Sequence, residues 1–209
     1  MAVRSSKDVA FFLVGGYDVL GAVTQIDDMR SAALERTDTL GDLWEEWAYV
    51  GVRKAELTQQ GFFDDAARGN NIALTTGPGV SRVLVWGIAG TATGAEFEAW
   101  SGAMEVNFDF QAQRGALTKA NAKYVGNGPV ETGRVIRSYA GAVATGATTG
   151  TPLDNGASSS GVGGYFAYNN VTSGEANVRI LDSPDNITYS ALFTFAKTAS
   201  AAGAAGAER

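Results

Sequence analysis

The chain has 209 residues, including 27 glycines but no cysteine and no histidine, which excludes a disulfide framework, zinc hydrolase chemistry and Ser-His-Asp catalysis. Hydrophobic residues make up 45% and charged residues only 18%, as expected for a globular protein whose surface largely meets other subunits. With 16 basic and 22 acidic side chains, the net charge of −6 disfavours binding to nucleic acid phosphates.

Apolar and polar residues alternate along much of the chain, and this period of two predicts β-strands. In chain order the expected strands are 9–14, 50–63, 83–88, 95–99, 104–110, 116–125, 134–140, 164–168, 177–180 and 187–195. Connections at 101–103 and 183–186 are expected to close hairpins. The run 83–86 is apolar at every position, so we expect a central strand that is covered on both faces.

Helical signals are few. Residues 29–40 are rich in Ala, Leu, Glu and Arg and favour a helix, although their threonines suit a strand equally well. Residues 64–68 favour one or two helical turns that end at Gly69. The stretch 141–164 is rich in Gly, Ala, Thr and Ser and predicts a long loop, and 199–209 predicts a loose tail.

The charge is divided unevenly along the chain. Residues 1–115 carry 9 basic and 16 acidic side chains, whereas residues 116–209 carry 7 and 6. The sequence therefore predicts an acidic β core over 1–115 and a Gly-rich β half over 116–198, followed by a flexible tail over 199–209. The Gly-rich half either completes the first part or is appended to it.

The sequence contains no apolar run near the roughly 20 residues that span a bilayer. The first residues lack a long apolar signal core, because the short run 9–14 meets two glycines at once. We therefore expect a protein that is used without secretion and without membrane contact.

Residues for chemistry are sparse. Only Glu96 and Glu98, among the paired carboxylates, share a strand face, and a solvated or interface role is favoured over catalysis there. The glycines near 15–21 lack the spacing and the Lys-Ser/Thr pair of a phosphate loop. The turns at 154–156 and 182–186 lack the ligand ladder of a calcium loop. We expect no catalytic, cofactor-binding or metal-binding residue, and therefore no enzyme.

Aromatic residues cluster in one acidic segment. Trp44, Trp47 and Tyr49 lie beside the adjacent pair Glu45 and Glu46. Large aromatic side chains either bury themselves between subunits or form a platform for sugar rings. The mixture of aromatic and charged residues favours a protein interface, and a carbohydrate platform remains the alternative.

Three segments, in order, resemble tail tube (major tail) proteins of long non-contractile-tailed bacteriophages. They are 41–54 continuing through 57–65, then 116–124 followed by 128–131, and finally 153–156 with 163–165 and 178–185. Each motif alone is short, and their order and spacing carry the resemblance. Together they cover about half of the chain.

The resemblance implies an all-β fold, mainly an antiparallel β-sandwich, with one short helix and long Gly-rich loops. It implies a subunit that forms hexameric rings, which stack into a hollow tube in the virion tail after assembly in the host cytoplasm. Implied partners are other copies of the chain and the tape-measure, tail-terminator and distal tail proteins, while DNA passes without specific binding. The candidate subunit-contact residues are Gly41, Asp42, Trp44, Trp47, Gly51, Gly61, Phe63, Asp64 and Asp65.

A channel that lets DNA slide must not hold phosphates, so an acidic lining suits it. The alternation of 95–99 and 104–110 places acidic side chains on the polar faces of two strands. The candidate lumen residues are Glu96, Glu98, Glu105 and Asp109. Two other classes of function stay open at this point: a carbohydrate-binding β-sandwich module of a phage or bacterial surface protein, and a hydrolase that uses carboxylates alone.

Overall fold

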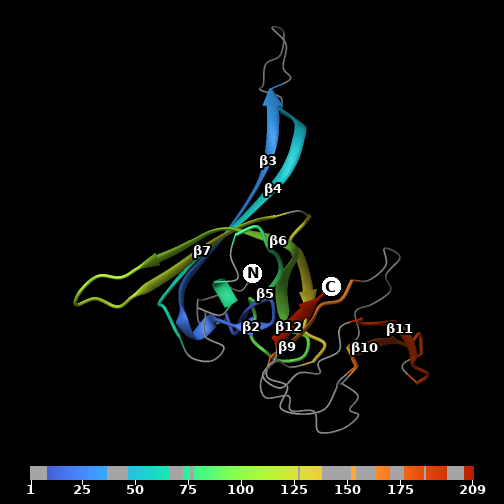
Figure 1. Cartoon of the computed structure of the whole chain (residues 1–209). Helices are drawn as coiled ribbons and strands as arrows, with labels where there is room; N and C mark the ends of the chain where they lie inside the picture. The colour runs from blue at the N-terminus through green and yellow to red at the C-terminus, as the bar shows by residue number, and fades with distance from the viewer. Residues whose placement is uncertain are drawn as a thin grey trace.

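The computed structural model describes most of the chain. The described residues are 9–36, 47–65, 73–75, 78–126, 128–137, 152–153, 163–169, 177–185, 187–196 and 205–209. The strands (Figure 1) are β1 (Phe12–Val14), β2 (Tyr17–Asp18), β3 (Val23–Arg36), β4 (Trp47–Gly61), β5 (Ser81–Gly87), β6 (Glu96–Gln111), β7 (Lys119–Gly126), β8 (Glu131–Arg134), β9 (Phe166–Asn169), β10 (Arg179–Asp182), β11 (Ser190–Thr194) and β12 (Ala205–Glu208). A 3-10 turn, η2, covers Leu20–Ala22.

One large sheet contains the first eight strands. Its order is β2-β1-β5-β6-β7-β4-β3, and β8 pairs with β6 beside this path. Every strand pair in it is antiparallel, as are the two small sheets β10–β11 and β12–β9. The predicted all-β, mainly antiparallel fold is therefore confirmed.

The large sheet curves around a core on its concave face. Phe12, Leu84 and Trp100 from one half of the sheet pack with Leu57 and Tyr124 from the other half, and all five are essentially buried. Burying large apolar side chains is the main favourable term in folding. This core therefore holds the two halves of the curved sheet together.

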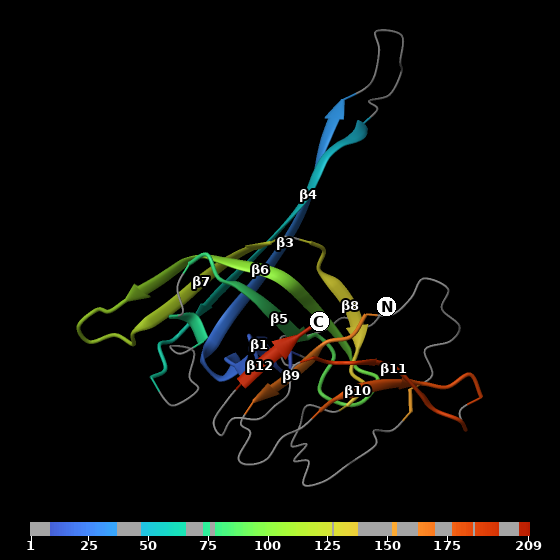
Figure 2. The same cartoon turned by 45° about the vertical axis from the view of Figure 1, so that its right-hand side comes forward.

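The opposite face of the sheet is covered locally. Leu13, Val85 and Ala99 are buried there, with Tyr165 and Ala167 packed against them from the β9 segment. In two views, β9 and β12 lie against the β1–β5 region (Figures 1 and 2). The prediction that 83–86 is central and covered on both faces is confirmed, because β5 contributes to both apolar clusters.

Two hairpins project from the body in different directions. The ribbon of β3 and β4 extends far beyond the rest of the sheet, and the β6–β7 hairpin reaches out on another side (Figures 1 and 2). The ladder of β3 and β4 runs from Val23↔Gly61 to Arg36↔Trp47. We call its outer part, residues 29–36 and 47–54, the arm.

Two of the local predictions are wrong. The helix expected over 29–40 is a strand as far as residue 36, because pairing with β4 overrides a weak local helical preference. The connection expected at 101–103 lies inside β6, which pairs with β5, β7 and β8 along its length. Residues 37–40 lie outside the described residues, and so does most of the expected loop at 141–164.

Three other predictions concern the second hairpin, the short helix near residue 64 and the charge boundary near residue 115. The second hairpin is confirmed, since β10 and β11 pair on either side of the turn near 183–186. Residues 64–65 have no helical structure, and 66–69 lie outside the described residues. The position 115 falls in the connection between β6 and β7, which pair with each other in the same sheet. The charge boundary therefore does not separate two sheets.

The expectation of a loose tail is wrong for its last residues. Residues 205–208 form β12, which pairs with β9. Gly206 lies so close to Tyr168 that a Cβ atom would be 2.7 Å from its ring, and Ala207 is buried. The small side chains that made this segment look unstructured are what allow it to dock closely. Residues 199–204 lie outside the described residues.

Candidate assembly surfaces

The described side chains of the arm, those of residues 29–33 and 53–54, lie on both of its faces. Every arm side chain that the structure describes is exposed, including Met29, which is 61% exposed. In the described sheet, β3 pairs with β4 on one side only, so it forms the edge of the sheet. An edge strand presents unpaired backbone N–H and C=O groups that another strand can bind. The arm is therefore the part of the molecule best built to pair with another chain.

The predicted contact residues divide into two groups. Gly41, Asp42 and Trp44 lie outside the described residues. Trp47 begins β4 opposite Arg36 at the outer end of the arm. Gly51 lies within β4, near a register shift between Ala32 and Leu34 on the opposite strand. Their role in subunit contact stays a prediction.

The remaining contact candidates lie at the other end of β4, where the chain leaves the sheet. Gly61 is buried, and a Cβ atom there would be 2.4 Å from the Ala22 carbonyl oxygen. Phe63 packs edge-on against Phe110, with ring centroids 5.1 Å apart. Asp64 is partly exposed and Asp65 exposed. Close packing within the subunit therefore explains the glycine at position 61 without any subunit contact.

The four acidic lumen candidates do not share one face. Glu96 and Glu98 lie on the side of the concave core, whereas Asp109 lies on the opposite, convex side with its cross-strand partner Asn121. A bulge between Glu105 and Asn107 breaks the alternation of β6. The expectation that Glu105 and Asp109 share one polar face is therefore wrong, because one extra residue shifts the later side chains to the other side.

Glu98 ties distant strands together. Its Oε2 accepts a hydrogen bond from Trp86 Nε1 at 2.9 Å, and its Oε1 lies 2.7 Å from Arg30 Nη2. Arg30 comes from β3, which is separated from β6 by β7 and β4 in the sheet order. Arg30 also binds Asp28 on its own strand, a hydrogen bond that raises the Arg30 pKa. This ion pair joins the base of the arm to the far half of the curved sheet.

Glu105 is buried, contrary to the prediction that it lines a channel. Its side chain is completely buried, and its Oε2 lies 3.3 Å from Nε of Arg82, which is 8% exposed. Burial raises the pKa of Glu105, and the positive charge of Arg82 opposes that shift. Arg82 follows the alternation of β5 with the buried Leu84, and the bulge of β6 between Trp100 and Ala103 turns Glu105 to the same side. A residue in this position contributes to folding and cannot face a channel.

Further polar atoms surround this pair. Burial first, and then the charge of Glu105, raise the pKa of Tyr124 on β7. Among the described residues, the Tyr124 hydroxyl, the Gln59 amide and both Glu105 carboxylate oxygens have no hydrogen-bond partner. Sequence reasoning missed this cluster. The available signal was Arg82, an ionisable residue in phase with the apolar Leu84 and Trp86.

The convex side of β3, β4, β7 and β6 forms a polar surface, which we call the outer face. Its polar members, identified from cross-strand register, are Gln25, Asp27, Glu56, Thr58, Gln60, Asn107, Asp109, Gln111, Lys119, Asn121 and Lys123, and the apolar Met29, Val125 and Met104 lie in the same row as Glu56. Glu56 binds Lys54 and Lys123, the latter at 3.0 Å, and the two hydrogen bonds lower its pKa. Amides and paired charges therefore dominate this face.

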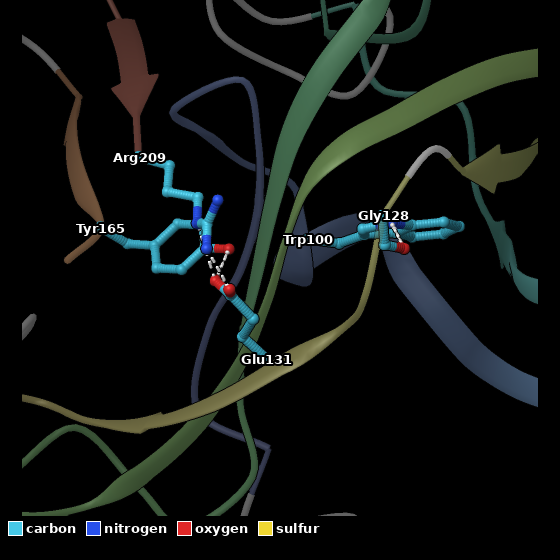
Figure 3. Close-up of polar contacts among 5 residues, drawn as sticks. All are labelled: Trp100, Gly128, Glu131, Tyr165 and Arg209. Carbon is cyan, nitrogen blue, oxygen red and sulfur yellow. Dashed lines mark hydrogen bonds and ion pairs between the residues drawn. The ribbon is translucent and has the colours of Figure 1, made fainter. Parts of the chain in front are cut away.

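The last residue of the chain binds back to the large sheet. Arg209 Nε and the Tyr165 hydroxyl both donate to Oε2 of Glu131 on β8, at 2.9 and 2.5 Å, and Arg209 Nη2 donates to the other oxygen (Figure 3). Burial and the hydrogen bond to Glu131 raise the pKa of Tyr165. Nearby, Trp100 Nε1 donates to the Gly128 carbonyl at 3.2 Å. The hydrogen bonds from Arg209 to Glu131 anchor the end of β12 to the large sheet.

The described residues offer little that resembles a chemical site. Among them there is no cluster of three or more Asp or Glu side chains that could hold a metal ion. In the same part of the chain, no helix is long and apolar enough to cross a membrane. The geometry therefore directs attention to surfaces rather than to a cleft.

Comparison with known proteins gives matches only among solved structures. No protein-family model matches the sequence, and no curated protein matches it. The chain is similar to a protein in the tail of an empty GTA particle with C6 symmetry, at 16% identity and a TM-score of 0.48, covering 62% of this chain and 98% of that one. It is also similar to a protein in the virion of a native gene transfer agent (GTA) particle, at 15% identity and a TM-score of 0.46, covering 63% and 99%. Both TM-scores are below 0.5, so the function proposed below rests on this chain's own residues and geometry.

Proposed function

We propose that this chain is a structural subunit of a virion tail, which assembles into hexameric rings that stack into a hollow tube. The observation that carries the proposal is the arm, a long ribbon whose described side chains are all exposed. The ordered sequence motifs that resemble tail tube proteins supply the class of assembly. No catalytic role is part of the proposal.

The arm needs a partner for physical reasons. An isolated two-stranded ribbon is marginally stable in water, because it has no third strand or helix against which to bury a face. Natural proteins usually protect long edges such as that of β3. In an assembly, a neighbouring subunit covers both the exposed faces and the open edge. The exposed arm is therefore explained as an assembly element.

The outer face suits a channel wall. It joins amides and hydroxyls with acidic and basic side chains, some of them paired, and it includes one apolar cross-strand row of Met29, Val125 and Met104. Sliding DNA requires a surface without a concentrated positive field, because lysine and arginine clusters bind phosphates. We infer that this mixed polar face lines the tube. It replaces the purely acidic lining expected from the sequence, and Asp109 is the one original lumen candidate on it.

The same proposal places the chain in the virion tail after assembly in the host cytoplasm. Its partners are other copies of itself and, from the sequence resemblance, tape-measure, tail-terminator and distal tail proteins. DNA passes through the tube without specific binding. Such a role uses strand edges and projecting hairpins, and both are prominent in this molecule (Figure 2).

Sedimentation velocity tests the role of the arm. The variant Ala32→Lys with Ala33→Lys places charges on both sides of the exposed edge strand, where lysine disfavours pairing with another strand. The wild-type protein is expected to form large assemblies as its concentration rises, and this variant to form none of these large assemblies at the same concentrations. The matched control, Ala92→Lys with Thr93→Lys in an exposed loop, is expected to assemble normally.

Two results would contradict the proposal. A wild-type protein that stays monomeric at high concentration and is retained on a polysaccharide column would favour the carbohydrate-binding alternative. An arm variant that assembles as well as the wild type would show that the arm is not the assembly element.

A further inference from the structure

The end of the β6–β7 hairpin, residues 110–119, is apolar and basic; we call it the tip. Leu117 is 70% exposed and Phe110 is 51% exposed. Arg114 and Lys119 are exposed beside them, and the segment contains no acidic residue. Exposed apolar side chains gathered at one end of a projecting hairpin mark a contact surface. This surface carries positive charge.

A hollow lies at the base of the tip, between the start of β3, the ends of β4 and β6 and the start of β7. It is lined by Thr24, Gln60, Gly61, Phe62, Gln111, Lys119 and Asn121. Its groups are an ammonium, three amides, a hydroxyl and one aromatic ring. Such a lining accepts a carboxylate or backbone polar groups next to an apolar side chain. Gln60, Gln111, Lys119 and Asn121 also belong to the outer face, so the hollow lies where that face meets the tip.

The β10–β11 hairpin has the opposite character. Ile187 is 81% exposed and Leu192 is 46% exposed. Asp182 and Asp185 are exposed beside them, and Arg179, the exposed first residue of β10, is the one basic residue between positions 179 and 196. Its surface is therefore apolar and negatively charged.

The turn of this hairpin is held firmly by Asp185. The Asp185 Oδ1 atom accepts hydrogen bonds from the Thr188 and Ile187 amides at 2.8 and 2.9 Å and from the Ser183 hydroxyl at 3.0 Å. These bonds lower the pKa of Asp185, so the turn persists in its charged form. Ile187 is thus presented on a rigid turn, which reduces the entropy lost on binding.

The two surfaces lie on opposite sides of the molecule. In both views the β6–β7 hairpin extends to one side and the β10–β11 hairpin to the other (Figures 1 and 2). A contact between two different patches of the same chain is heterologous, and repeating it through a fixed rotation closes a ring. Opposite charge on the two patches fixes their orientation and disfavours contacts between like patches.

We propose that the tip of one copy docks on the β10–β11 hairpin of the next copy around the ring. Arg114 and Lys119 face Asp182 and Asp185, and the exposed apolar side chains of both hairpins are buried between them. This inference rests on the proposed function and names one contact within it. A second copy is the occupant because the same chain carries both complementary surfaces.

Two variants, each defective in one surface, test this contact. The tip variant is Leu117→Asp with Arg114→Glu, and the hairpin variant is Ile187→Asp with Leu192→Asp. Each is expected to raise the protein concentration needed for assembly by at least about tenfold, as for loss of a buried apolar anchor. Ile136→Asp, at an apolar residue that is 42% exposed and lies outside both surfaces, is the matched control and is expected to assemble normally.

Mixing the two variants gives the decisive result. Each retains the surface that the other lacks, so an equal mixture is expected to form dimers, seen by sedimentation velocity, at concentrations at which either variant alone stays monomeric. Circular dichroism verifies the strand content, and Leu117→Ser and Ile187→Ser replace any aspartate variant that loses it. A mixture that stays monomeric, or single variants that assemble like the wild type, would overturn the inference while leaving tube formation intact. A wild-type chain that never assembles would overturn both.

Discussion

The pair of Arg82 and Glu105 is the most costly polar feature of the core. Removing one member of a buried ion pair leaves an uncompensated charge, whereas replacing both by apolar residues is often neutral or stabilising. We predict that Arg82→Met, which leaves Glu105 buried without its counter-charge, lowers the free energy of unfolding by about 3 kcal/mol and that Arg82→Met with Glu105→Leu recovers most of it. Urea unfolding of the wild type and of these variants measures both values.

If the double variant loses as much unfolding free energy as the two single substitutions added together, the two residues are independent and this account of the pair is contradicted. Arg53→Met with Glu96→Leu, at exposed charged residues on β4 and β6, is the control and is expected to change stability by less than about 1 kcal/mol.

The raised pKa of Glu105 also predicts how stability depends on pH. The folded protein holds the Glu105 proton more tightly than the unfolded chain, whose carboxyl has the ordinary value of 4.5. The resulting stabilisation is fully present below that value and is lost as pH rises through the folded pKa. Comparing unfolding from pH 4.5 upward, we expect this decline in the wild type and its absence in Glu105→Gln. Parallel pH profiles for the two proteins would contradict the assignment.

Gly61 illustrates how a motif glycine can serve packing alone. Its close approach to Ala22 predicts that Gly61→Ala lowers the free energy of unfolding by about 1–3 kcal/mol through local overpacking. Gly21 has nothing within 4 Å of its Cβ position, so Gly21→Ala is expected to stay within about 0.5 kcal/mol of the wild type. Equal stability of Gly61→Ala and Gly21→Ala would contradict this packing role and leave subunit contact as the one proposed role of Gly61.

Among the elements, β12 depends on Glu131. The variant Glu131→Gln keeps the shape of the side chain but removes the charge that Arg209 and Tyr165 share. Because the pair is partly exposed, we expect a loss of about 1 kcal/mol or less, concentrated in the docking of β12. Hydrogen exchange should show faster exchange of the 205–208 amides with little change in β5. Unchanged exchange in β12 would mean that its pairing with β9 suffices.

The sequence predicts strands and turns well where neighbouring residues alone determine them. The apolar run at 83–86 and the β10–β11 turn need only local reasoning, and both are confirmed. The β6 strand is different, because a bulge between Glu105 and Asn107 depends on pairing with β7 and reverses the face of the following residues. β12 was missed because its affinity for β9 comes from close packing of small residues, which carries no periodic signal.

For the candidate surfaces, the sequence identified the segment but not its geometry. The contact candidates Trp47 and Gly51 lie on the arm, yet the arm itself was expected to begin with a helix. The abundance of acidic residues is clear from the sequence, but a count of residues does not tell on which face of a curved sheet each side chain lies. The separation of Glu105 from Asp109 is a property of the folded sheet.

At the scale of the whole molecule, the outer face predicts weak interaction with DNA. Gln60→Lys with Asn107→Lys adds two positive charges to exposed positions on that face. Tubes of this variant are expected to retain duplex DNA at low salt and release it as salt rises, whereas wild-type tubes do not bind it. Ala92→Lys with Thr93→Lys adds the same charge elsewhere, and equal DNA binding by these control tubes would contradict the placement of the channel wall.

The central claim is that this chain builds a hollow tube through its arm. Negative-stain electron microscopy of the purified wild-type protein, concentrated alongside the Ala32→Lys/Ala33→Lys variant, tests it most directly. Rings that stack into tubes with a stain-filled channel are expected for the wild type, and no tubes are expected for the variant. Wild-type images that show only single particles at every concentration, or solid fibres without a channel, would contradict it.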